Sequence, residues 1–375
     1  MFMRIGGMAG VWRTSPPGSE RAQRGQSGFG VGLFGRAPPS LLLLCGNIAP
    51  VRATVVIPTY KRSSRLRALL SCLAAHPTDA LARVVVCDDG SPDDTGQSAQ
   101  LFATKLPLVY RRHEDLGFRA GQARNMGIES AIGEVIIFVD DDVLISPNFV
   151  EAHVRAHQEG IRRGEPRLVI GYRHRRFGDP ESHPTLSEIR EGELDDRVVV
   201  IGSEGESVGK HATPWMFVYS CNFSVLRDTP ELGFDDGFVG WGLEDIDAGY
   251  RLWRSGLTVH AAPEARVLHI EDPAPRDPFR CEERELPPVY DTYVRNAVYF
   301  MDRHPEDAAV RDWVRKDLRW FVRDEARNAW VKNGYANDVD VVIRHCREEL
   351  AAAGRTPRPH LIRQLTTKHP SALGV

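Results

Sequence analysis

Between residues 53 and 139, apolar strand-like segments alternate with helical segments, and this alternation constrains the fold more than any other feature. Runs rich in Val and Ile predict buried strands at 53–57, 83–87, 108–110 and 135–139. The stretches between them predict helices at 62–76, 93–104 and 119–131. Short connections between strand and helix predict an α/β fold, with a mostly parallel sheet covered on both faces. Ligands of such sheets bind at the carboxyl ends of the strands.

Composition limits the classes of protein and partner. The 375 residues carry 48 basic and 51 acidic side chains, a formal charge of −3, which argues against a protein that coats nucleic acid. Six scattered cysteines without a C-x-x-C pair fit a reducing compartment, so we expect a cytoplasmic protein. No apolar run approaches the roughly 18–20 residues that span a bilayer, although peripheral association with a membrane stays open.

Three aspartates directly follow the strand predicted at 135–139. Carboxylates this close repel one another unless a cation or hydrogen-bond donors lie among them. In an extended segment, Asp140 and Asp142 point to one side and Asp141 to the other. Oxygen ligands at an open site suit Mg²⁺ or Mn²⁺ that bridges a substrate's phosphates. We therefore expect a divalent metal at Asp140 and Asp142, with a strand-end turn or a helix-capping cluster as the alternative.

Charged residues also lie next to the neighbouring strands. Asp88 and Asp89 follow the strand at 83–87, where a carboxylate can accept the imide N–H of uracil or cap the next helix. Arg119 and Arg124 stand near a predicted helix start, where two guanidinium groups can hold a diphosphate. A solvated helix face is the alternative for the two arginines.

The segment Gly-Trp-Gly-Leu-Glu-Asp at 240–245 combines an aromatic ring with two carboxylates. Glycines on both sides of Trp241 permit an exposed loop whose ring stacks on a sugar. One of Glu244 and Asp245 can take a proton while the other binds hydroxyl groups, or the pair can simply complement a helix dipole. His269 follows a short apolar strand; it is either a satisfied structural residue or a ligand that favours Mn²⁺.

Five segments, in this order, resemble the successive motifs of family 2 glycosyltransferases. They are Val-Val-Ile-Pro-Thr-Tyr at 55–60, Cys-Asp-Asp-Gly-Ser at 87–91, Ala-Arg-Asn-Met-Gly at 123–127, Phe-Val-Asp-Asp-Asp at 138–142, and the segment at 240–245. The last is similar to that of chondroitin-polymerase-like and galactosyltransferase-type members. The resemblance spans roughly residues 52–272. It implies a GT-A fold and an inverting transfer from a nucleotide sugar, commonly a UDP-sugar, with Mn²⁺ or Mg²⁺.

The resemblance also implies roles for single residues. Pro58 and Tyr60 would line the base pocket, and Asp89 would contact uracil. The diphosphate would be bound by Arg119 and Arg124. The implied metal ligands are Asp140, Asp142 and His269.

On the acceptor side, Asp245 would be the catalytic base, with Glu244 as a second catalytic carboxylate and Trp241 and Gly242 at the acceptor. The predicted reaction is an in-line displacement by an acceptor hydroxyl, in which the metal neutralises the departing diphosphate. The predicted donor is a UDP-hexose or UDP-N-acetylhexosamine, and the acceptor is a glycan, a lipid-linked intermediate or a small molecule. Two alternatives stay open: a non-catalytic nucleotide-sugar or carbohydrate-binding protein, and a metal-dependent phosphohydrolase.

These assignments divide the chain. Residues 1–50 are expected to be a disordered extension, and 51–272 the glycosyltransferase domain, with a nucleotide-binding half at 51–145 and an acceptor half at 146–272. Residues 285–355 are expected to be helical and 356–375 to form a tail. The stretches 173–213 and 285–375 fall outside anything the motifs explain.

Overall fold

The core of the protein is a β-sheet that draws its strands from residues 53–271. The computed structural model describes residues 50–177, 193–194, 208–271, 289–333 and 335–360. Residues 51–375 form one unit of mutual contacts, separate from Met1–Pro50. Of the extension predicted at 1–50, residues 1–49 lie outside the described residues. So do the chain beyond 360 and residues 197–201, where the sequence also predicts a weak strand.

Nine strands of the described chain join this sheet. They are β1 (Ala53–Thr59), β2 (Leu81–Asp88), β3 (Leu108–Arg112), β4 (Val135–Phe138), β5 (Val143–Ile145), β6 (Arg167–Phe177), β7 (Glu193–Leu194), β8 (Phe223–Leu226) and β9 (Thr258–Glu271). Their order is β3-β2-β1-β4-β8-β6-β9-β5, with β7 beside β6. The first four strands are parallel, as is the pair β6–β9.

The predicted α/β class is confirmed by this sheet. Its second half also contains antiparallel neighbours, since β8 runs opposite to both β4 and β6, and β5 runs opposite to β9. The apolar runs do not indicate this reversal, because a stretch of Val and Ile is compatible with either strand direction.

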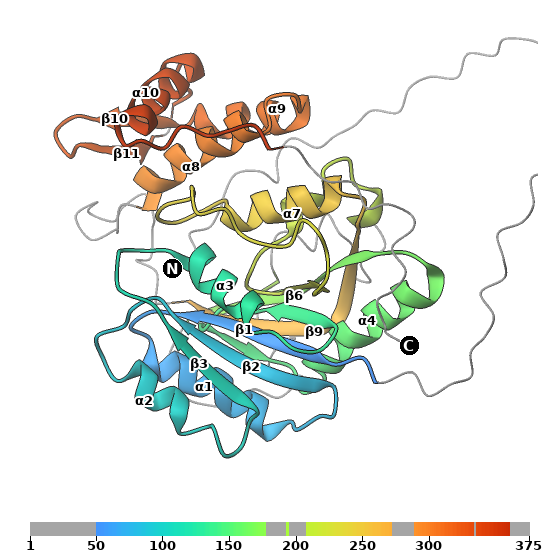
Figure 1. Cartoon of the computed structure of the whole chain (residues 1–375). Helices are drawn as coiled ribbons and strands as arrows, with labels where there is room; N and C mark the ends of the chain where they lie inside the picture. Colours follow the sequence, from blue (N-terminus) through green and yellow to red (C-terminus); the bar gives the residue numbers. More distant parts are fainter. Residues whose placement is uncertain (1–49, 178–192, 195–207, 272–288, 334, 361–375) are drawn as a thin grey trace, which may run out of the picture. The chain divides into compact units, whose positions relative to one another are not determined.

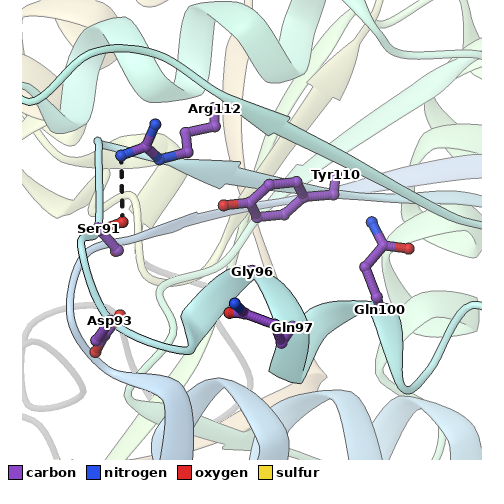
Figure 2. A pocket seen from close by; sticks show the side chains of 7 residues that line it. All are labelled: Ser91, Asp93, Gly96, Gln97, Gln100, Tyr110 and Arg112. Carbon is purple, nitrogen blue, oxygen red and sulfur yellow. Dashed lines mark hydrogen bonds between the residues drawn. The ribbon is translucent and has the colours of Figure 1, made fainter.

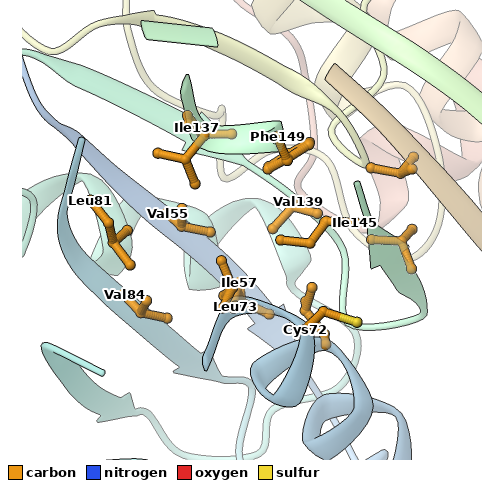
Figure 3. Close-up of a cluster of buried hydrophobic side chains, with 14 of the residues drawn as sticks. Val55, Ile57, Cys72, Leu73, Leu81, Val84, Ile137, Val139, Ile145 and Phe149 are labelled. Atoms are coloured by element: carbon orange, nitrogen blue, oxygen red, sulfur yellow. The ribbon is translucent and has the colours of Figure 1, made fainter. Parts of the chain in front are cut away.

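Successive residues of the central strands supply two separate apolar cores. Val55 and Ile57 of β1 belong to the core beneath the sheet, which Figure 3 shows, whereas Val56 belongs to the core on the opposite face. This follows from the two-residue period of a strand. Because both faces are covered, β1 is buried along its whole length, which explains its unbroken apolar sequence.

Helices cover both faces of the sheet (Figure 1). One face is covered by α1 (Ser63–Ala75), α2 (Thr95–Gln100) and α4 (Phe149–Arg163), and the other by α3 (Ala120–Glu129) and α7 (Glu244–Arg254). The predicted helix at 93–104 is shorter than expected, because only Thr95–Gln100 is regular.

A third apolar core joins α7 to the C-terminal region. That region contains α8 (Val289–Arg303), α9 (Ala308–Leu318) and α10 (Val339–Ala352). Ala248 and Leu252 of α7 face the sheet core, whereas Ile246 and Tyr250 pack in a cluster with residues of α8. Helix α7 therefore lies between the sheet and the C-terminal helices, as Figure 1 shows.

The region predicted to be helical also holds a hairpin. Strands β10 (Phe321–Asp324) and β11 (Ala329–Lys332) pair in an antiparallel manner. Asn328 makes the turn with a φ of 52°, a left-handed conformation that Asn tolerates better than most residues. The expectation of helix there was wrong because the short strands lack the Gly-containing turn that normally announces a hairpin.

Candidate active site

The three aspartates lie in a turn, residues 140–142, which we call the aspartate turn. Thr59, the last residue of β1, donates a hydrogen bond of 2.7 Å to Asp141 Oδ2. Arg62, just before α1, donates to Asp141 Oδ1 at 3.1 Å and to Asp142 Oδ2 at 2.7 Å. The polar end of β1 therefore meets the aspartate turn at the carboxyl edge of the sheet, where the sequence predicted a site.

The expected alternation of these side chains was wrong. Asp141 and Asp142 share the Arg62 guanidinium, whereas Asp140 pairs with Arg124 through a 2.8 Å contact from Nη2 to Oδ1. The rule that alternate residues point the same way holds only in a strand. Here β4 ends at Phe138 and the chain turns at once into β5.

Asp142 and His269 are brought together by the pairing of β5 with β9. His269 Nε2 lies 3.3 Å from Asp142 Oδ1, and both side chains are buried. Asp142 Oδ1 accepts no hydrogen bond from the described residues. Burial raises the pKa of Asp142, but the interactions of its carboxylate with His269 and Arg62 outweigh burial and hold that pKa well below its usual range. A buried carboxylate oxygen beside an imidazole fits the donor set that a divalent cation prefers.

The third predicted ligand is directed elsewhere. Asp140 is occupied by Arg124, and in the described ranges no group of three His, Cys, Asp or Glu side chains gathers closely enough to hold a metal ion. The structure thus joins Asp142 to His269 and leaves Asp140 outside the pair. Metal ligation by these residues stays a prediction.

Arg124 of α3 connects the aspartate turn to α7. Its Nη1 donates to Glu244 Oε1 at 3.0 Å, while its Nη2 donates to Asp140. Burial lowers the pKa of Arg124, but the two carboxylates more than reverse this, so the guanidinium stays charged. Both terminal nitrogens of this predicted diphosphate ligand therefore contact carboxylates. The Arg119 side chain has different partners: it donates to Gln122 Oε1 and to the Glu114 carbonyl.

Asp245 lies next to this ion-paired group. Its Oδ2 accepts from the backbone N–H of Ser220 at 3.1 Å and its Oδ1 from that of Ile246 at 2.8 Å. Burial raises the pKa of Asp245 to about 7, with the adjacent Glu244 carboxylate adding to the effect and Arg124 opposing it. The residue as a whole is half-buried. Each carboxylate oxygen has a second lone pair, so the group can still accept a proton.

The residues before α7 form a tight turn, 239–243, which we call the glycine turn. Gly240 and Gly242 have φ values of 76° and 107°, and Leu243 has 73°. This left-handed backbone favours glycine. Trp241 is half-buried with its ring centroid 5.7 Å from that of Tyr293 on α8. The sequence predicted an exposed loop, but Trp241 is only partly exposed because its ring lies against a second aromatic ring.

At the end of β2, the two aspartates have different partners. Asp88 is buried and accepts from the Ser91 backbone N–H at 2.7 Å, a local turn contact. Asp89 Oδ1 lies 2.6 Å from His113 Nε2, and Asp89 Oδ2 accepts from the Arg119 backbone N–H at 2.7 Å. Burial raises the pKa of Asp89. His113 is a neighbour that the sequence did not indicate.

The two remaining base-pocket candidates flank the end of β1. Pro58 is buried within the strand, and Tyr60 donates a 2.8 Å hydrogen bond to Asp115 Oδ2. The structure therefore places Tyr60 and Asp89 around one loop, residues 113–119, through Asp115, His113 and Arg119.

A hollow of about 380 Å³ lies beside the site, between α2 and β3. Figure 2 shows its lining, which is Ser91, Asp93, Gly96, Gln97, Gln100, Tyr110 and Arg112. None of the predicted site residues lines it. Two of its lining residues contact Asp88: the Tyr110 hydroxyl donates to Asp88 Oδ2 at 2.5 Å, and the Ser91 N–H donates to Asp88 Oδ1 at 2.7 Å.

Comparison with protein families matches two segments of the chain. Residues 54–205 match the family model described as Glycosyl transferase family 2, and residues 232–273 match the one described as N-terminal domain of galactosyltransferase. The first segment contains the aspartate turn and the second the glycine turn. Residues 54–205 of this chain therefore carry a family 2 glycosyltransferase domain. Its α/β sheet agrees with the GT-A fold class that the resemblance implies.

Named relatives of the chain include sugar transferases and polysaccharide synthases. It is 33% identical over 230 residues to the validoxylamine A glucosyltransferase of Streptomyces hygroscopicus subsp. jinggangensis, covering 56% of this chain and 54% of the relative. It is 27% identical over 244 residues to the chondroitin synthase of Escherichia coli, covering 59% and 35%. The chain thus spans about half the length of the first curated relatives it matches.

Among solved structures, the chain is similar to the mannosyltransferase PcManGT from Pyrobaculum calidifontis in complex with GDP-Man and Mn²⁺. That likeness has a TM-score of 0.48 and 15% identity, and it covers 81% of this chain and 76% of the other. Within the described part of the chain, no helix has the length and apolar character needed to cross a membrane.

Proposed function

We propose that this protein is an inverting glycosyltransferase that moves a sugar from a nucleotide sugar to a hydroxyl group, with Asp245 as the general base. The proposed donor is a UDP-hexose or a UDP-N-acetylhexosamine. The acceptor class stays open between a glycan, a lipid-linked intermediate and a small molecule. The family 2 domain supports the reaction class, and the residues of the two turns support the mechanism.

The observation that carries the proposal is the environment of Asp245. A general base works best when its pKa lies near the working pH, because it must be ionised and yet hold a proton well. Burial and Glu244 raise the pKa of Asp245 to about 7, and the residue is half-buried. An ordinary aspartate, with a pKa near 3.8, would be a much weaker acceptor for a hydroxyl proton.

In the proposed step, the acceptor oxygen forms a bond to the anomeric carbon as its proton passes to Asp245. The bond from that carbon to the diphosphate breaks on the opposite face, so the sugar inverts and nucleoside diphosphate leaves. Glu244 is held by Arg124 and is directed at acceptor hydroxyls, and Trp241 offers its ring face to a sugar. Arg124 also supplies positive charge near the leaving group.

Asp142 and His269 are the residues that would hold a divalent metal, with Asp140 completing the set only if it leaves Arg124. A bound Mn²⁺ or Mg²⁺ would neutralise the charge that develops on the departing diphosphate. Imidazole ligation favours Mn²⁺. At the other end of the donor, Asp89 and Tyr60 would contact the base, and Arg119 the phosphates.

The first test is calorimetric titration of UDP into the protein, with and without Mn²⁺, with GDP as the comparison nucleotide. We expect micromolar UDP binding that requires the metal. UDP release is then measured with UDP-glucose, UDP-galactose and their N-acetylamino forms as a donor panel. Binding without turnover of any donor would favour a non-catalytic binding protein, and formation of UMP with sugar phosphate would favour a phosphohydrolase.

The second test addresses the base. Asp245→Asn should lower the rate of UDP release by about 10²–10⁴-fold, the usual contribution of a general base. UDP affinity should stay within about twofold, since the change removes no proposed nucleotide contact. Asp312→Asn is the matched control, because that side chain is 76% exposed and lies on α9. Wild-type turnover in Asp245→Asn would assign the base elsewhere.

A further inference from the structure

The glycine turn is held by α8, a helix that lies outside both segments matched by the family models. Asn296 is completely buried, and its Nδ2 lies within hydrogen-bond distance of three carbonyl oxygens of the turn. These are the oxygens of Val239 at 3.3 Å, Trp241 at 3.3 Å and Gly242 at 3.0 Å. The side-chain amide of Asn296 therefore binds carbonyl groups that lie outside the regular hydrogen bonding of strands and helices.

A second residue of α8 holds the tryptophan backbone. Thr292 Oγ1 accepts from the Trp241 N–H at 3.0 Å and lies 3.2 Å from the Trp241 carbonyl oxygen, to which it donates. The approach is close: a Cβ placed on Gly240 would lie 2.3 Å from Thr292 Cγ2. Glycine at position 240 is thus required by both its φ and the helix against it.

The orientation of the Asn296 amide is itself determined by a third residue. Arg355, which follows α10, donates from Nη2 to Asn296 Oδ1 at 2.8 Å and to the Gly237 carbonyl at 2.7 Å. A guanidinium can only donate, so it must face the amide oxygen and leave the Nδ2 hydrogens for the glycine turn. The chain end after α10 therefore contributes to the same assembly.

We propose that Asn296 is a positioning residue for the transfer reaction: it fixes the glycine turn and thereby places Trp241 and Asp245. The turn leads directly into α7, whose first residues are Glu244 and Asp245. The Asp247 N–H already bonds to the Leu243 carbonyl, so displacement of the turn displaces the first helical residues with it. The claim about catalysis rests on the proposed function, whereas the claim that Asn296 holds the turn does not.

Hydrogen–deuterium exchange of the full chain tests whether Asn296 fixes the glycine turn. Asn296→Asp keeps the volume and the Arg355 contact but replaces the donor with a carboxylate that cannot donate. Thr292→Val is a milder second variant, with nearly the same shape and no hydroxyl. We expect amides of residues 238–247 to exchange at least about tenfold faster in Asn296→Asp and more modestly faster in Thr292→Val, while residues 53–59 of β1 are unchanged.

Asn337→Ala is the matched control. Asn337 belongs to the same C-terminal region, and its Nδ2 likewise donates to backbone carbonyls, those of Arg319 at 3.2 Å and Phe321 at 3.0 Å. It makes no contact with the glycine turn. Unchanged exchange over 238–247 in both Asn296→Asp and Thr292→Val would overturn the proposal. Equal acceleration in Asn337→Ala would also overturn it, because the effect would then reflect general loosening.

The proposed effect of Asn296 on catalysis needs a measurement that distinguishes it from unfolding of the variant. For the best donor of the panel, Asn296→Asp should lower the maximal rate of UDP release at least about tenfold and leave UDP affinity within about twofold. Faster exchange with wild-type turnover would refute the catalytic role and keep the structural one. If wild type releases no UDP from any donor, the proposed function fails, while the exchange experiment still decides whether Asn296 holds the turn.

Discussion

Turnover should fall about tenfold for each pH unit below 7, because the proposed base must lose its own proton before it can accept another. The pKa of Asp245 is raised to about 7, chiefly by burial. With that value, about half of the Asp245 side chains are ionised at pH 7, about a tenth at pH 6 and about a hundredth at pH 5. The rate should therefore rise with pH along a single proton step and level off above pH 7.

A substitution of Glu244 tests how the pKa of Asp245 is set. The charge of Glu244 raises the pKa of the adjacent Asp245, and its ion pair with Arg124 neutralises a charge that lowers that pKa. Glu244→Gln removes the negative charge that repels the Asp245 carboxylate. It also leaves the positive charge of Arg124 without the Glu244 partner, so that Arg124 attracts Asp245 more strongly. Both effects lower the pKa of Asp245. Charges about 5 Å apart at an effective dielectric constant of about 20 interact by about 3 kcal/mol, which corresponds to about two pH units. The midpoint should therefore move down by about one to two units.

The assay is the initial rate of UDP release at saturating donor and metal, from about pH 5 to about pH 8.5, with UDP affinity measured at each pH. The affinity control separates ionisation of the base from ionisation of nucleotide contacts. A rate that does not depend on pH in this range would refute the assignment of the base. A midpoint that rises in Glu244→Gln would refute the account of how its pKa is set.

Three further predictions test the metal pair, the packing and the buried polar core. Arg62→Ala should strengthen Mn²⁺ binding about two- to fivefold in calorimetry, because the guanidinium that contacts Asp142 is 38% exposed and comparable pairs contribute about 0.4–1 kcal/mol; weaker binding would contradict this. Gly127→Ala should lower the free energy of unfolding in urea by about 1–3 kcal/mol, because a Cβ there would lie 2.3 Å from Val56 Cγ1, and an unchanged value would be inconsistent with that contact. Burial lowers the pKa of His153 in the folded protein to about 4. As the pH drops, His153 therefore becomes protonated in the unfolded chain before it does so in the folded protein, and the free energy of unfolding falls between about pH 6.5 and about pH 4. Urea unfolding should show less of that loss in His153→Gln than in wild type, and equal losses would exclude His153 as a source.

Much of the donor half could be predicted from the sequence. The strands at 53–57, 83–87 and 135–139 are present as β1, β2 and β4, because an unbroken run of Val and Ile has few other places to lie than a doubly covered sheet. The carboxyl ends of parallel neighbours meet at one edge, so the positions of Asp89 and of the aspartate turn follow from chain order alone. These features depend on residues close together in sequence.

The partners of those side chains could not be predicted in this way. Arg62 reaches Asp142 across 80 residues, and Arg124 reaches Glu244 across 120. Contacts between residues so far apart in sequence produce no periodic pattern along the chain, because they depend on how whole helices pack rather than on local spacing. The same holds for His113 beside Asp89, and for the hairpin in a region that was expected to be helical.

The sequence by itself determined the parallel part of the sheet, the edge at which polar residues gather, and the kind of chemistry those residues can perform. Only the tertiary structure decided which carboxylate is paired, which is buried, and which helix holds the glycine turn. The physical reason is that a side chain's chemical type is local, whereas its pKa and orientation depend on desolvation and on charges brought from distant segments. Asp140 and Asp142 stand two residues apart, yet one binds Arg124 and the other lies between Arg62 and His269.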